Sequence, residues 1–161
     1  MLILSSMVFI IISASLPAGD VEHACEKASG LTAVRTIQCS DANCMYDEID
    51  GAAEKIIKAG GAAALFIDLG KIGETNPMAR VEIFSSKTKS GGRNILDAVS
   101  GDKKSRDQKD IGETPDFARS EFAKGPHMVK IFSTDKSLGK DRVDSIKNAL
   151  EKLLEPKPKK K

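Results

Sequence analysis

The sequence predicts an α/β fold: a three-layer sandwich around a mostly parallel sheet, with one antiparallel hairpin between Ala62 and Ser86. Two observations support this prediction. Residues 127–154 have the pattern of a strand, a short polar loop and an amphipathic helix, which together make half of a βαβ unit. Residues 81–99 repeat the pattern, so two such units should lie in one sheet.

The internal repeat includes the phrase before each unit. Residues 72–80 read IGETNPMAR and residues 111–119 read IGETPDFAR, while the repeated strands read VEIFSS and VKIFST. If the two strands are parallel neighbours, the loops that follow them open at the same edge of the sheet. Ligands of open parallel sheets bind at that edge, so we expect a site there.

Alternation along the repeated strands predicts which side chains share a face. One face should hold Val81, Ile83, Val129 and Ile131, and the other should hold Phe84 and Phe132. Helices are expected to cover the sheet with the apolar residues Val143, Ile146 and Leu150 and, from an earlier helix, Ile56 and Ile57.

The other elements follow from helical periodicity and from glycine and proline breakers. A helix should begin near Asp20 and end at Gly30, with a strand at residues 31–39. One helical stripe extends from residue 46 to residue 57, and a buried strand should follow at 62–70. Residues 117–123 should form a short helix, with Pro115 in its first turn.

Residues 1–18 have two interpretations. They form either a signal peptide or a first core strand, because the apolar run precedes small residues but no basic residue stands before it. The run is shorter than the roughly 20 residues of a membrane span, so no transmembrane span is expected. We prefer the signal peptide, which predicts a secreted or membrane-associated protein. Residues 19–154 should form a single α/β domain, and residues 155–161 a basic tail.

Composition limits the function. Aromatic residues make up 4% of the chain and the net charge is +2, so neither base-stacking platforms nor bulk charge predict nucleic-acid binding. The sequence contains no phosphate-binding glycine loop and no nucleophile motif. We therefore expect a protein that is not an enzyme.

Two loops rich in serine and lysine are the candidate anion sites. They precede predicted helices, where free N–H groups favour negative charge. The candidate anion-binding residues are Ser86, Lys87, Lys89, Lys136 and Lys140.

Residues 111–141 resemble the second half of a von Willebrand factor A domain, in which a Gly-x-Thr loop precedes a helix, a buried strand and a Thr-Asp turn. The resemblance implies a site for a divalent cation such as Mg²⁺, with Thr114 and Asp135 as ligands. Ser13 and Ser15 match the serines of the family's Asp-x-Ser-x-Ser motif, whose acid is absent here. The resemblance also implies a protein partner at the loops after the strands.

The three cysteines allow buried thiols or one disulfide, because an odd number cannot form a fully paired framework. The C-x4-C spacing of Cys39 and Cys44 is neither the redox C-x-x-C nor a usual zinc motif. A weaker resemblance is to thioredoxin-like domains, with Cys44 leading a helix and Pro77 preceding a strand. It implies a redox protein, although the C-x-x-C motif of that family is missing.

The sequence therefore predicts a non-enzymatic binding module. It should contact a protein partner through loops at the carboxyl ends of the strands, with a divalent cation as a possible addition. The alternatives are a protein that binds anions or nucleic acid through the Ser/Lys loops and the basic tail, and a thioredoxin-like redox protein.

Overall fold

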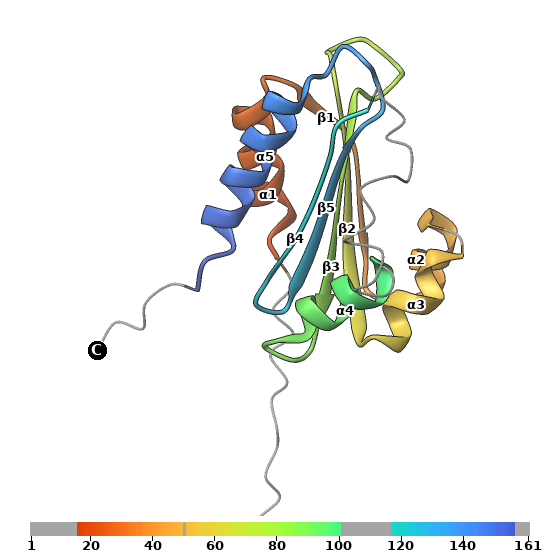
Figure 1. Ribbon diagram of the computed structural model, residues 1–161. Helices are drawn as coiled ribbons and strands as arrows, with labels where there is room; N and C mark the ends of the chain where they lie inside the picture. Colours follow the sequence, from red (N-terminus) through yellow and green to blue (C-terminus); the bar gives the residue numbers. More distant parts are fainter. Residues whose placement is uncertain (1–15, 50, 101–116, 157–161) are drawn as a thin grey trace, which may run out of the picture.

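The computed structural model describes residues 16–49, 51–100 and 117–156. In this part of the chain, five helices and five strands form one α/β unit (Figure 1). The helices are α1 (Ala18–Ser29), α2 (Ala42–Ile49), α3 (Ala52–Lys58), α4 (Gly91–Val99) and α5 (Lys140–Leu153). The strands are β1 (Thr32–Cys39), β2 (Gly61–Gly70), β3 (Ala79–Ser86), β4 (Arg119–Lys124) and β5 (His127–Ser133).

The sheet has the strand order β1-β2-β3-β5-β4, and every neighbouring pair is antiparallel. The prediction of a mostly parallel sheet is therefore wrong. The hairpin expected between Ala62 and Ser86 is present as β2 and β3. The repeated strands β3 and β5 are neighbours, but they run in opposite directions, with Ala79 opposite Ser133 and Ser85 opposite His127.

The direction of β5 is set by the segment before it. Residues 117–123 were expected to be helical, but residues 119–124 form strand β4, which pairs with β5 through a tight hairpin. Gly125 adopts a φ of 56° in this hairpin, a left-handed conformation that glycine adopts at little cost. The extra strand reverses the chain, so β5 enters the sheet at the end where β3 leaves it.

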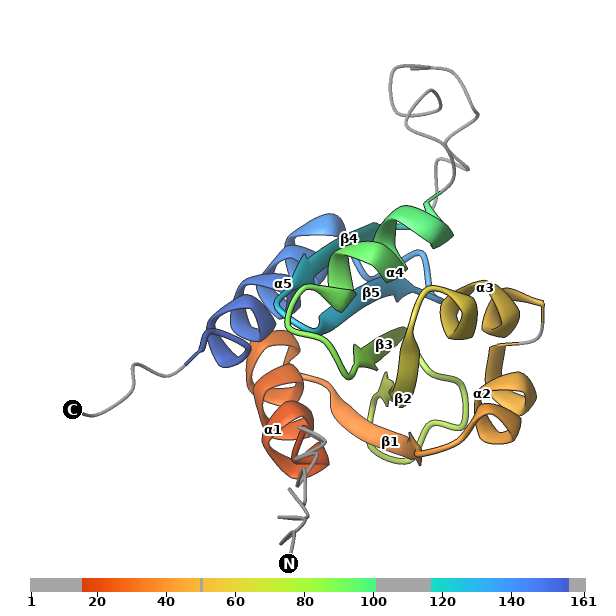
Figure 2. The same ribbon diagram turned by 90° about the horizontal axis from the view of Figure 1, so that it is seen from below.

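Helices cover both faces of the sheet (Figures 1 and 2). Helices α1 and α5 pack on one face, over a core that includes Val81, Ile83, Val129 and Ile131. Helices α2, α3 and α4 pack on the other face, where Phe84 belongs to a second core. The predicted alternation along β3 and β5 is thus confirmed, because Phe132 also lies on the second face, at the border of a cavity.

The helix contacts expected from the sequence are also present. Val143, Ile146 and Leu150 of α5 are buried in the first core, and Ile56 of α3 is buried in the second, with Ile57 partly buried against it. The single stripe predicted over residues 46–57 is divided between α2 and α3. Helix α1 ends at Gly30, whose φ of 69° makes a left-handed C-cap, as predicted.

Several predictions fall outside the described residues. They concern most of the signal peptide or first strand expected at residues 1–18, of which 1–15 are not described, and most of the basic tail expected at 155–161, of which 157–161 are not described. Among the helices that the structure describes, none has both the length and the apolar character needed to cross a bilayer.

Candidate functional site

Charged residues form two rows across the sheet on the face of α2, α3 and α4. The strand register places Arg35, Asp68, Arg80, Phe132 and Arg119 opposite one another, in the order of the strands. The neighbouring row holds Ile37, Phe66, Glu82, Lys130 and Glu121. Wherever two charged residues are neighbours along a row or between the rows, one is an acid and the other a base, which is the arrangement that stabilises cross-strand pairs.

Arg80 is the most highly connected residue of the two rows. Its guanidinium donates from Nη2 to Glu48 Oε2 at 3.1 Å, from Nη1 to Asp68 Oδ1 at 3.3 Å and from Nε to Glu82 Oε1 at 3.1 Å. The Arg80 side chain is only 16% exposed. Three different elements therefore supply carboxylates to one largely buried cation.

Two further cations complete the network. Arg35 binds Glu48 at 2.7 Å and Asp68 at 3.4 Å, and Lys130 Nζ lies 3.4 Å from Glu82 Oε2. Hydrogen bonds from Arg35, and then from Arg80, lower the pKa of the Glu48 carboxyl. Each buried carboxylate has a cationic partner, as burial of charge requires.

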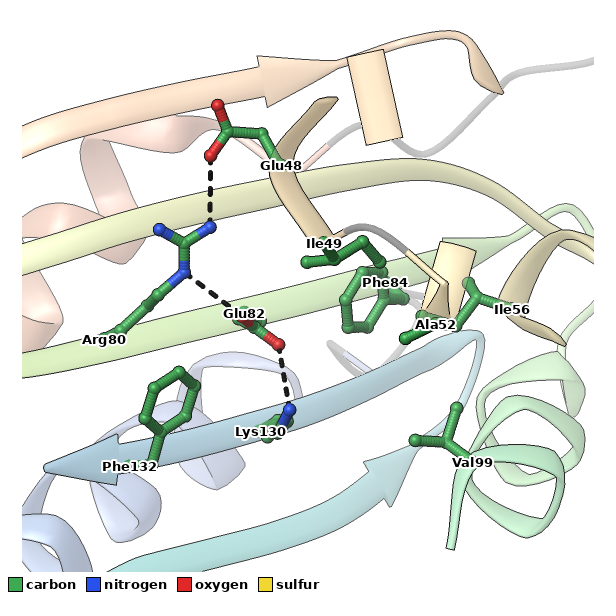
Figure 3. Close-up of a pocket in the computed structure, with 10 residues that line it drawn as sticks. All are labelled: Glu48, Ile49, Ala52, Ile56, Arg80, Glu82, Phe84, Val99, Lys130 and Phe132. Carbon is green, nitrogen blue, oxygen red and sulfur yellow. Dashed lines mark hydrogen bonds and ion pairs between the residues drawn. The ribbon is translucent and has the colours of Figure 1, made fainter. Parts of the chain in front are cut away.

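A cavity of about 370 Å³ opens beside this network (Figure 3). One half is apolar, and the other half is charged, with Arg80, Glu82 and Lys130 connected by ion pairs. Helix α2 contributes Glu48 above the sheet (Figure 3). The apolar half consists of Ile49, Ala52, Ile56, Phe84 and Val99.

A second cavity of about 350 Å³ borders Lys130 and Phe132, which also line the first cavity. It reaches Phe117 and Arg119 at the edge strand β4. We call the two cavities together the Phe132 groove. Its charged residues include both acids and bases, so the groove offers an apolar surface with hydrogen-bonding groups rather than a field of one sign.

The internal repeat explains the symmetry of the groove. The sequence Ala-Arg-x-Glu occurs twice, at residues 79–82 in β3 and at residues 118–121, where β4 begins. These two strands flank β5 on either side. As a result, two arginines lie opposite Phe132 and two glutamates lie opposite Lys130.

A disulfide holds α2 beside the sheet. Cys39 at the end of β1 is bonded to Cys44 in the first turns of α2, with Cα atoms 5.4 Å apart. The N–H of Cys44 also donates to Asp41 Oδ1 at 3.0 Å, which caps the helix. Because Glu48 belongs to the same short helix, the disulfide limits where this carboxylate can lie.

The remaining cysteine is separate from the groove. Cys25 lies in α1 as a buried free thiol, and burial raises the pKa of this thiol to about 12. It is therefore poorly suited to thiolate chemistry. Cys44, the residue expected to lead a helix in a redox protein, is bonded to Cys39.

The predicted anion-binding residues are not brought together. Ser86 is the last residue of β3 and Lys87 and Lys89 follow it, while Lys136 and Lys140 follow the end of β5. Since β3 and β5 are antiparallel, the two loops lie at opposite ends of the sheet. A shared edge for both loops was the consequence of a parallel sheet, and that expectation is wrong.

The predicted metal ligands lie mostly outside the described residues, because Thr114, Ser13 and Ser15 are not among them. Asp135 is described and exposed. Its Oδ1 accepts a hydrogen bond from the Ser137 N–H at 2.7 Å, and hydrogen bonds from Ser137 lower the pKa of this carboxyl. Within residues 16–49, 51–100 and 117–156, no three His, Cys, Asp or Glu side chains cluster as a metal site would require. The Mg²⁺ site stays a prediction.

Comparison of the chain with protein-family models, with curated proteins and with solved structures found no match. The resemblance to von Willebrand factor A domains therefore also stays a prediction.

Proposed function

We propose that this chain is a non-enzymatic binding module that receives an apolar side chain of a protein partner in the Phe132 groove. The observation that supports this proposal is the cavity of about 370 Å³, with one apolar half and one charged half. Binding pockets commonly combine an apolar lining with a few polar groups that fix orientation.

The charges of the groove favour a neutral or apolar group over a free ion. Arg80, Glu82 and Lys130 are paired with one another or with Glu48 and Asp68. An incoming ion of either sign would have to displace one of these partners, and removing one member of a buried pair is costly. An aliphatic or aromatic side chain can fill the apolar half while its backbone reaches the charged half.

The same proposal includes export of the protein. The Cys39–Cys44 disulfide supports it, because disulfides persist in oxidising compartments and are rare in the cytosol. The apolar run in residues 1–15 agrees with a signal peptide. Sequencing of the native N-terminus is the test. A start near residues 16–19 is expected, whereas a retained Met1 would contradict export.

The binding proposal is tested with a displayed library of random peptides, selected against the purified protein. Ala52 is exposed at the mouth of the cavity, so Ala52→Trp fills the cavity without entering the core. The matched control is Ala24→Trp, which fills a depression of about 560 Å³ between α1 and α5 on the other face.

Selected peptides should have an apolar residue in common. They should lose at least about tenfold in affinity for Ala52→Trp, which corresponds to roughly 1.4 kcal/mol, and bind Ala24→Trp like the parent. The proposal is wrong if no peptide is enriched, or if the selected peptides bind Ala52→Trp as well as they bind the parent.

A further inference from the structure

We propose that β4 pairs with β4 of a second copy of this chain, so that two sheets join into one continuous antiparallel sheet. Strand β4 is the last strand in the sheet order and pairs only with β5 among the described strands. An edge strand has a row of N–H and C=O groups without a ladder partner, which is the template for adding another strand.

The hydrogen-bond pattern identifies the outward groups. The Ser133 N–H donates to the Ala118 carbonyl at 2.9 Å, so residue 118 directs its backbone toward β5. In antiparallel pairs the direction alternates from residue to residue. Residues 119, 121 and 123 therefore direct their N–H and C=O groups to the open edge.

Only some registers satisfy these outward groups. In a symmetric antiparallel pair, outward residues must face outward residues. A pair centred on Arg119 or on Glu121 meets this condition, but it places like charges directly opposite each other, which is destabilising. A pair centred on Ser120 also meets it, and places Arg119 of each copy opposite Glu121 of the other.

The side chains around Ser120 are complementary in this register. On the groove face, Phe117 lies opposite Ala123 of the second copy, so that a large side chain meets a small one. Phe117 is 45% exposed in the single chain, although it is a large apolar residue. On the opposite face, Ala118 meets Phe122 in the same way. Each pairing occurs twice because the arrangement has twofold symmetry.

A comparison with Arg80 shows which ion pair Arg119 would form in the dimer. Arg80, its counterpart in β3, has Asp68 of β2 opposite it, and the two side chains are paired at 3.3 Å. Arg119 has no strand opposite it on that side within the described residues, and its side chain is 57% exposed. In the dimer, Glu121 of the second copy takes the position that Asp68 has beside Arg80.

The dimer should dissociate on dilution. Residues 117–123 of each copy form the contact, which is far fewer than the roughly 20–30 residues per side of a standard interface. The test is therefore sedimentation velocity of the full chain at a series of concentrations from micromolar to millimolar. The parent is expected to change from monomer to dimer over this series.

Variants that reverse the charge of Arg119 or Glu121 test whether the dimer forms through β4 or through another surface. Arg119→Glu places glutamates opposite each other at two places, and Glu121→Arg does the same with arginines, so each variant should be monomeric throughout. The double variant with both changes restores opposite charges and should dimerise like the parent. The matched control is Arg93→Glu, which removes an exposed arginine from an ion pair within α4 and should dimerise normally.

Circular dichroism verifies that each variant is folded. A parent that stays monomeric at every concentration would overturn the proposal. So would single variants that dimerise like the parent, or a double variant that is folded but monomeric. None of these outcomes depends on peptide binding in the Phe132 groove, so the two proposals are tested separately.

Discussion

Arg80 and Arg119 occupy the same place in two copies of Ala-Arg-x-Glu, and each donates from Nε to the glutamate two residues later, at 3.1 Å and 3.0 Å. Their surroundings differ. Arg80 lies in a central strand, where Glu48 and Asp68 also bind it, whereas Arg119 lies in the edge strand. The Ala-Arg-x-Glu motif therefore forms the same arginine–glutamate ion pair twice. The position of the strand in the sheet decides how deeply each pair is buried and how many further partners it has.

The largest effect that follows from this comparison is the cost of removing the inner arginine. Arg80→Met keeps much of the apolar stem but leaves Glu82, Asp68 and Glu48 short of a cation in a poorly hydrated place. We expect a loss of about 3–5 kcal/mol in the free energy of unfolding, measured by urea denaturation. Arg119→Met is the matched control, and should change that free energy by less than about 1 kcal/mol. Equal losses in both variants would remove the distinction between the two copies.

A second prediction concerns the core between the sheet and helices α1 and α5. Ile131 of β5 and Leu150 of α5 are fully buried in the core under the other face of the sheet. Ile131→Ala and Leu150→Ala should each cost about 2–5 kcal/mol and clearly lower the melting temperature. Lys136→Ala changes an exposed side chain and should alter stability by no more than about 0.5 kcal/mol. Three variants that melt like the parent would show that this strand and helix are not in the core.

A smaller effect is expected from a neutral buried pair at the other end of β3 and β5. His127 is buried, and its Nδ1 lies 2.8 Å from Ser85 Oγ. Burial lowers the pKa of this imidazole below its ordinary value of 6.5. The unfolded chain therefore binds a proton at a higher pH than the folded chain does.

The folded protein should become less stable as the pH falls. The stability contributed by neutral His127 is complete above the unfolded pKa of about 6.5, and it is lost progressively as the pH falls below that value. Urea denaturation between about pH 8 and about pH 5 should show this loss in the parent and a smaller one in His127→Gln. The same pH dependence in both proteins would exclude His127 as its source.

The sequence predicted the elements better than their directions. The alternation of Val81 and Ile83 with Phe84, and the stripe along α5, depend on local periodicity and are present as expected. Residues 119–124, RSEFAK, have no β-branched residue, and they form a strand because the Gly125 hairpin pairs them with β5. That tertiary pairing reverses β5, and with it the expected common edge for the two Ser/Lys loops.

The Phe132 groove could not be predicted from the sequence either, because it also requires the pairing of β4 with β5. The sequence shows glutamate inside the apolar run VEIF and lysine inside VKIF, and a charged residue within a buried strand indicates a partner nearby. The repeated segments ending at Arg80 and Arg119 are visible in the sequence. That Arg80 and Arg119 lie on either side of Phe132 follows only from the register of three strands. Glu48 and Asp68 could not be assigned to Arg80 from the sequence, because they come from other elements.

The comparison of Arg80 with Arg119 is tested most directly by determining whether β5 lies between β3 and β4. Nuclear Overhauser contacts between α-protons are strong where antiparallel residues form a non-hydrogen-bonded pair, since their Cα atoms are then only about 4.5 Å apart. The structure predicts such contacts between Val81 and Ile131 and between Glu121 and Lys130. Both contacts together would place Arg-x-Glu strands on both sides of β5. Helical contacts along residues 119–124, with no contact from Glu121 to Lys130, would contradict this arrangement, and with it the groove and the proposed edge.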